Sequence, residues 1–368
     1  MSKQLGRKVQ VYYAGELIAA CREKTFDISN ESIDISGGYS DGLNHFLDYA
    51  GRKSYAVSIA GLYFGKSLRD IARGSNLIKS LSLVYEDESI QGNFFMDSYS
   101  EGIPYNDATT FTVSLIADGD VTAVKICQNY ELGDFLGLGQ ASRNWRAMTT
   151  LGSDVYACVN NGDIYKQTGG VGDFIALGQT SRNWYGMTTL GTDVYACVYN
   201  GDIYKQTNGT GDFIALGQAS REWYGMTTLG SDVYACVNNG DIYKQTGGVG
   251  DFIALGQATR NWFGMTTLGT DVYACVYNGD IYKQTGGVGD FVALGQTSRQ
   301  WQGMTTLGTD VYASVQSGDI YKQTNGTGDF IALGQTTRNW RGMTTLDTDV
   351  YASVYDGDIY KSTATCVD

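Results

Sequence analysis

The sequence has very few of the residues that most catalytic and metal sites need. Its 368 residues include one histidine, His45, and one proline, Pro104. A zinc site with several histidines from one chain is therefore excluded, and the seven cysteines contain no Cys-x-x-Cys pair. The sequence also has no P-loop and no Gly-x-Ser-x-Gly motif, and His45 is the only histidine that a Ser/His/Asp set could use. We therefore expect neither an enzyme nor a bound cofactor or metal.

Long apolar runs and clusters of basic residues are missing too. No run of 18 apolar residues occurs, so no membrane span is expected, and the N-terminal residues lack the apolar core of a signal peptide. The net charge is −13. Without clustered Lys and Arg the chain is unsuited to tight binding of nucleic-acid phosphates. Passive contact with DNA, across a surface that repels it, remains compatible with this charge.

Glycine, tyrosine and a long internal repeat are what the sequence does have. The 49 glycines and 27 tyrosines fit many strands joined by tight turns. Six near-identical copies of about 39 residues, counted from Asp134, end one residue before the C-terminus. A repeat of this length that holds several short strands is typical of a β-propeller. Each copy has one tryptophan, and these are all the tryptophans of the chain: Trp145, Trp184, Trp223, Trp262, Trp301 and Trp340.

Each copy contains four strand candidates. In the second copy these are 185–191, 194–199, 202–206 and 213–216, and the Asn200-Gly201 pair is a strong hairpin signal. Four antiparallel strands would make one blade of the propeller.

The ends of the repeat predict how the propeller closes. If each blade begins at its tryptophan, the sixth blade lacks a fourth strand, and Asp134–Gly139 supplies one from the other end. We predict that this segment pairs with Asp358–Ser362, which removes the exposed sheet edges. Closure would bring Cys127 near Cys366, either as a disulfide that locks the ring or as two free thiols.

The other cysteines mostly belong to the repeat. Cys158, Cys197, Cys236 and Cys275 occupy one position, which the last two copies fill with Ser314 and Ser353. A position that accepts either residue needs a small side chain and not a thiolate.

The repeat resembles the tectonin and tachylectin type of propeller, with a tryptophan, a glycine-bounded turn and an Ile-Tyr strand in each blade. That resemblance implies sugar binding at repeated sites between blades. An aromatic ring beside amide and guanidinium donors suits a sugar. Alternatively, the tryptophan packs between blades and the arginine pairs with an aspartate such as Asp173 or Asp212. The residue after the tryptophan varies more than the rest of this motif. The candidate glycan-binding residues are Arg143, Trp145, Arg182, Trp184, Arg221, Trp223, Arg260, Trp262, Arg299, Trp301, Arg338 and Trp340.

The first 125 residues read as strands with one short helix. The helix should begin near Ser67 and end at Gly74. A polar, glycine-rich stretch, 36–52, is too long for a simple hairpin loop. We predict a β-sandwich or a partial barrel.

Two segments resemble the major tail tube proteins of long-tailed bacteriophages. One is FDISNESIDISGGYSDG, from Phe26 to Gly42, followed by a loop and the strand KSYAVSIAG; the other is Ile90–Val121. The resemblance covers residues of about 5–125. It implies hexameric rings stacked into a tube, with an inner β-barrel through which the viral double-stranded DNA passes. It also implies an inter-ring loop that includes Gly37, Tyr39, Asp41, His45 and Arg52.

Together these features predict an all-β chain: a tail tube domain (1–125), a linker (126–133) and a six-bladed propeller (134–368). The leading hypothesis is a structural subunit of a virion tail, assembled in the bacterial cytoplasm with copies of itself and other tail proteins. A propeller cannot fit a DNA-width bore and leaves little room for a sheath, which favours an outward position on a non-contractile, siphovirus-type tail. There it could contact host-surface glycans. The alternative is an oligomeric propeller lectin outside any tail.

Overall fold

The chain forms two compact units, Met1–Cys127 and Gln128–Asp368. The computed structural model describes residues 9–13, 16–31, 52–62, 72–73, 78–84, 88–102, 110–117, 122–125 and 130–367. The regular structure in these ranges is almost entirely β, which confirms the predicted fold class. Ala72 and Arg73, at the end of the predicted helix, are helical, and the rest of that prediction lies outside the described residues. So do Gly37, Tyr39, Asp41 and His45 of the predicted inter-ring loop, whereas Arg52 begins a strand.

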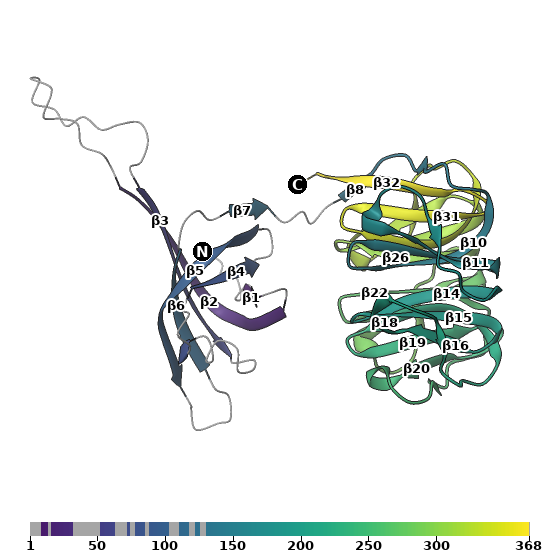
Figure 1. The fold of residues 1–368 in the computed structure, drawn as a ribbon, viewed down its shortest axis with the longest axis horizontal. Helices are drawn as coiled ribbons and strands as arrows, with labels where there is room; N and C mark the ends of the chain where they lie inside the picture. The colour runs from purple at the N-terminus through teal and green to yellow at the C-terminus, as the bar shows by residue number, and fades with distance from the viewer. Residues whose placement is uncertain are drawn as a thin grey trace, which may run out of the picture. The chain divides into compact units, whose positions relative to one another are not determined.

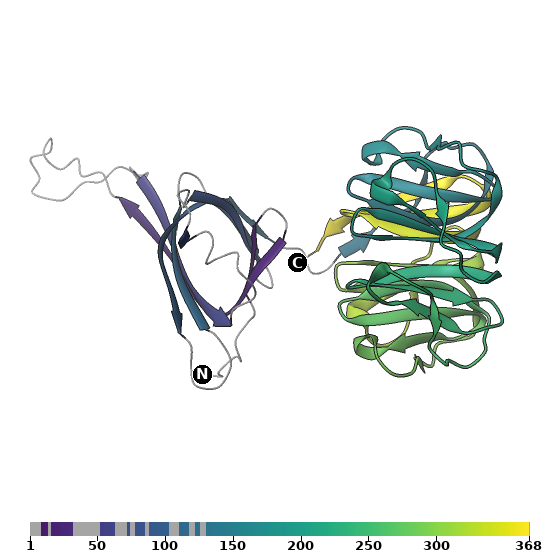
Figure 2. The same ribbon diagram turned by 60° about the horizontal axis from the view of Figure 1, so that its bottom comes forward.

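The first unit is a closed antiparallel barrel. Its strand order is β4-β1-β2-β3-β6-β5, and an additional β4–β5 pairing joins the two ends, so the partial barrel of the prediction is complete. A seventh strand, β7, pairs with β5. Figure 2 shows these strands curving around a common interior. The strands are β1 (Val9–Tyr13), β2 (Glu16–Glu31), β3 (Arg52–Leu62), β4 (Ile78–Val84), β5 (Glu88–Gly102), β6 (Thr110–Ala117) and β7 (Thr122–Lys125).

Side chains alternate between buried and exposed along two barrel strands, so each strand has a core face and an outer face. Phe94 and Met96 of β5 and Val113 and Leu115 of β6 are buried. Phe95, between the first two, is exposed, because successive side chains of a strand point to opposite faces.

The second unit is a propeller of six four-stranded blades in one 25-stranded sheet. The second blade consists of β14 (Arg182–Leu190), β15 (Asp193–Gly201), β16 (Ile203–Gln206) and β17 (Ile214–Ala215), close to the predicted ranges. Asn200 has the positive φ, 55°, that the predicted hairpin turn requires.

The remaining elements repeat this pattern. They are β10 (Arg143–Leu151), β11 (Asp154–Gly162), β12 (Ile164–Gln167), β13 (Ile175–Ala176), β18 (Arg221–Leu229), β19 (Asp232–Val237), β20 (Ile242–Gln245), β21 (Ile253–Ala254), β22 (Trp262–Leu268), β23 (Asp271–Gly279), β24 (Ile281–Gln284), β25 (Val292–Ala293), β26 (Arg299–Leu307), β27 (Asp310–Gly318), β28 (Ile320–Gln323), β29 (Ile331–Ala332), β30 (Arg338–Leu346), β31 (Asp349–Gly357), and the 3-10 turns η2 (Thr168–Gly170), η3 (Thr207–Gly209), η4 (Thr246–Gly248), η5 (Thr285–Gly287) and η6 (Thr324–Gly326).

The ring closes as predicted. Strand β9 (Leu136–Gly137) pairs with the last strand, β32 (Ile359–Cys366), and so supplies the fourth strand of the sixth blade. Strand β8 (Tyr130–Leu132), which the sequence assigned to a linker, pairs with β32 as well and belongs to the propeller (Figure 1). This pairing shortens the linker that was predicted to span residues 126–133.

A carboxylate and a disulfide-bonded cysteine lie at this junction. Asp358 accepts hydrogen bonds from the backbone N–H groups of Gly139 (2.8 Å) and Gln140 (2.7 Å). Cys366, at the end of β32, is disulfide-bonded. Cys127 lies outside the described residues, so the Cys127–Cys366 pairing stays a prediction.

Candidate functional site

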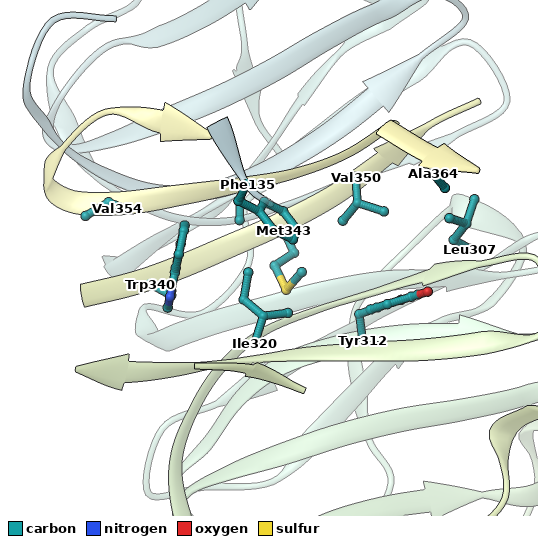
Figure 3. Packing of buried hydrophobic residues seen from close by; sticks show 10 residues of the cluster. Phe135, Leu307, Tyr312, Ile320, Trp340, Met343, Val350, Val354 and Ala364 are labelled. Carbon is teal, nitrogen blue, oxygen red and sulfur yellow. The ribbon is translucent and has the colours of Figure 1, made fainter. Parts of the chain in front are cut away.

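The six tryptophans are buried between neighbouring blades. Trp184 is 1% exposed and packs with Ile164 of the preceding blade and Phe213 of its own. The ring of Tyr204 meets its indole edge-on at 5.1 Å. Figure 3 shows the corresponding cluster at the closing blade, where Trp340 lies near Phe135 and Met343. The tryptophans therefore cannot stack on a sugar, and of the two roles considered for them, their burial favours packing between blades.

The six arginines of the motif lie over tyrosine rings. The guanidinium of Arg182 lies 4.7 Å from the centre of the Tyr204 ring, and the other five blades repeat this contact. Asp212, the expected partner, instead accepts a hydrogen bond from the side chain of Gln179 at 3.5 Å. The arginine therefore caps the packed aromatic cluster of its own blade and forms no repeated arginine–aspartate pair within residues 130–367.

The repeat cysteines are buried and free. Burial raises the pKa of the Cys158 thiol to about 12, so the thiolate is disfavoured. In the fifth blade the hydroxyl of Ser314 accepts a hydrogen bond from the Gly303 N–H (3.0 Å) and donates one to the Arg341 carbonyl (2.8 Å). This position thus joins neighbouring inner strands through a small polar atom, as its exchange between Cys and Ser indicates.

The inner strands approach one another closely around the propeller axis. A Cβ atom on Gly186 would lie 2.0 Å from the carbonyl oxygen of Tyr224 in the next blade, so glycine is required there. The innermost strands of all six blades line an axial cavity of about 150 Å³. The residue after each tryptophan is part of this lining. These residues, in blade order, are Arg146, Tyr185, Tyr224, Phe263, Gln302 and Arg341.

Cationic groups gather on one side of this ring, because Arg341 and Arg146 belong to the neighbouring sixth and first blades. Arg341 is 9% exposed; its Nη1 donates to the Gln316 side chain at 2.8 Å, and its Nε has no hydrogen-bond partner. Burial, and then the nearby charge of Arg146, lowers the pKa of Arg341 to about 10, so it remains charged at neutral pH. Arg146 lies 4.4 Å above the Tyr185 ring.

Aromatic groups gather on the other side. The rings of Tyr224 and Phe263 lie 4.0 Å apart, and Tyr185 contacts Tyr224 at 4.7 Å. Tyr199 stacks on Tyr185 at 5.1 Å, and Tyr277 stacks on Phe263 at 4.9 Å. Burial raises the pKa of the Tyr224 hydroxyl, which therefore stays neutral. The position after the tryptophan is variable in the sequence, but nothing in the sequence predicts that these six residues form a common site.

The barrel can be compared with a known family. Residues 14–123 match the phage tail tube protein family. The match confirms the tail tube resemblance for most of the first unit and supports a structural role in a virion tail. No curated protein matches the chain. Within the described residues, no helix is long and apolar enough to span a bilayer.

Solved structures are similar to parts of the chain. One is a chain of the virion of a native gene transfer agent particle, with 18% identity and a TM-score of 0.29; the match covers 34% of this chain and 99% of that one. Another is a gluconolactonase from Xanthomonas campestris, with 8% identity and a TM-score of 0.50; the match covers 65% of this chain and 97% of that one. The likeness to the gluconolactonase shows the propeller fold alone.

Proposed function

We propose that the chain is a tail tube subunit whose barrel domains form hexameric rings, stacked around a channel for double-stranded DNA. The propeller then decorates the outside of a non-contractile tail. The family match over residues 14–123 supports the tube role. The size of the propeller supports its outward position, because a closed body of six blades is too large for a bore of DNA width.

The observation that carries self-assembly is an apolar patch on the outer face of the barrel. Phe95 of β5 is 37% exposed and Ile116 of β6 is 40% exposed, and the two are paired in register. Ile78 of β4 is paired with Phe95 on its other side and is 42% exposed. A contiguous apolar patch across three strands is typical of a surface that another subunit covers. Contacts that rise along an axis then produce stacked rings.

The lectin alternative loses its main support. It depended on six tryptophans available to sugars, and all six are buried. Any contact with host-surface glycans must therefore use groups other than the tryptophans.

Aspartate in the apolar patch tests the proposal. We expect Phe95→Asp and Ile116→Asp to prevent tube formation by the purified full-length protein, because each places a charge in the subunit contact. Sedimentation and electron microscopy measure assembly, and a thermal melt checks the fold. Ile175→Asp is the matched control, since Ile175 is 65% exposed on the propeller. Tubes formed equally well by all three variants would contradict the proposed contact, and a wild-type protein that never assembles would contradict the function.

A further inference from the structure

The near-identical blades differ where they surround the propeller axis. The ring of residues that follow the tryptophans, here named the axial mouth, holds arginine in two blades, aromatic residues in three and glutamine in one. In a closed ring of six, Arg146 is opposite Phe263, and Arg341 is opposite Tyr224. The variation at this one repeat position thus divides the axial mouth of a symmetric fold into a cationic half and an aromatic half.

The cationic half lacks an anion. Within residues 130–367, neither Arg146 nor Arg341 forms an ion pair, and the carboxylate of Glu222 instead accepts a hydrogen bond from Asn238 at 2.8 Å. Two neighbouring guanidiniums repel each other, and Arg341 is more than nine-tenths buried with its Nε unpaired. A ligand with a carboxylate or phosphate would relieve this repulsion and accept charge-assisted hydrogen bonds.

The aromatic half suits a ring with apolar faces. Tyr224 and Phe263 are half-buried and offer ring surface beside the cavity, while the tyrosine hydroxyls supply hydrogen-bonding groups. Gln302 is held by a hydrogen bond from its Nε2 to the Gln316 side chain at 3.1 Å. The cavity of about 150 Å³ is smaller than the sites that hold drug-sized ligands, so it fits a single ring.

We propose that the axial mouth binds an anionic sugar, with its acidic group on Arg146 and Arg341 and its ring against Tyr224 and Phe263. This site is separate from the arginine–tryptophan motif of the blades, whose tryptophans are buried. The proposed site lies in the propeller alone, whether or not the first unit forms tubes.

Titration calorimetry and saturation-transfer NMR on the full-length protein test the proposal. The probes are glucuronic acid, glucose 6-phosphate, glucose and acetate. We expect the first two to bind more tightly than glucose, which lacks the charge, and than acetate, which lacks the ring. Comparison of glucuronic acid with glucose 6-phosphate then distinguishes a carboxylate from a phosphate as the preferred anion.

Variants that copy the chain's own fifth blade identify the site. Arg146→Gln and Arg341→Gln introduce the residue that blade five carries as Gln302, so the fold should tolerate them. Each should weaken binding of the acidic sugars by about tenfold or more, because each removes charge-assisted hydrogen bonds. Lys205→Gln makes the same charge change at a lysine paired with Asp193 and should leave binding unchanged. Phe263→Ala should weaken glucuronic acid but not acetate.

Four results would overturn the proposal. They are no binding of either acidic sugar, equal affinity for glucose, equal affinity for acetate, or an equal loss of binding in Lys205→Gln and Arg146→Gln.

Discussion

At the scale of single residues, burial decides the chemistry of the repeat. Cys158 and Cys275 are fully buried, and burial raises the pKa of each thiol from 9.0 to about 12. The neutral thiol is therefore the form that the folded propeller stabilises. The resulting stabilisation of the folded state is fully present below pH 9 and is lost as the pH rises toward 12. The reason is that the exposed thiols of the unfolded chain release their protons at a lower pH than the buried thiols.

A serine variant tests this pH dependence. We expect the melting temperature of the wild-type protein to fall between pH 9 and pH 12. The fall should be smaller in the Cys158→Ser/Cys275→Ser double variant, since serine does not titrate there and the fold already accepts Ser314 at this position. Thermal melts across this range measure the difference, and identical slopes would show that the thiols do not contribute.

Some residue roles could be predicted and others could not. The exchange of Cys for Ser revealed a small buried position, since a functional thiol would not be replaced. The role of Trp184 stayed ambiguous, because both a sugar platform and a core need an aromatic ring, and only burial separates them. Arg146 and Tyr224 appeared merely variable, because a sequence does not reveal which positions meet around an axis.

At the scale of elements, closure of the ring depends on β9, β32 and Asp358. Asp202 makes the equivalent bonds in the second blade, to Gly217 (2.8 Å) and Gln218 (2.7 Å). Its partners are 15 and 16 residues away, whereas those of Asp358 are more than 200 residues away. The aspartate at this repeat position therefore joins segments of a single blade in the case of Asp202, whereas Asp358 joins the two ends of the ring.

Replacing these aspartates separates the two roles. Asp358→Ala should lower the unfolding free energy by roughly 2–4 kcal/mol, because it leaves backbone donors without a charged acceptor. It should also speed amide hydrogen exchange in β9 and β32, whereas Asp202→Ala should speed exchange only near its own blade. Mass spectrometry of exchanged peptides measures this, and unchanged protection of β9 and β32 in Asp358→Ala would refute the closing role.

The sequence predicted the strands of the propeller except one. The period and the Asn200-Gly201 turn fixed the strands of the second blade to within a few residues, and the missing fourth strand predicted the pairing of β9 with β32. Strand β8 was missed because Tyr130–Leu132 has no counterpart in the repeat. It becomes a strand only because β32 extends beyond the length of its equivalents and offers an edge.

At the scale of the whole molecule, two self-contained folds serve different proposed purposes. The barrel closes its own sheet through β4 and β5 and leaves an apolar outer patch, which indicates association through side chains. The propeller closes its own ring as well, since β32 pairs with β8 and β9 from the start of the same unit. Neither unit needs the other to complete its sheet, so a propeller could decorate a tube without altering it.

Electron microscopy of the purified full-length protein tests the central claim most directly. The account predicts tubes or stacked six-fold rings with a narrow open bore and propeller-sized density on the outside. Discrete particles that never assemble, or rings whose bore is filled by the propeller, would contradict it.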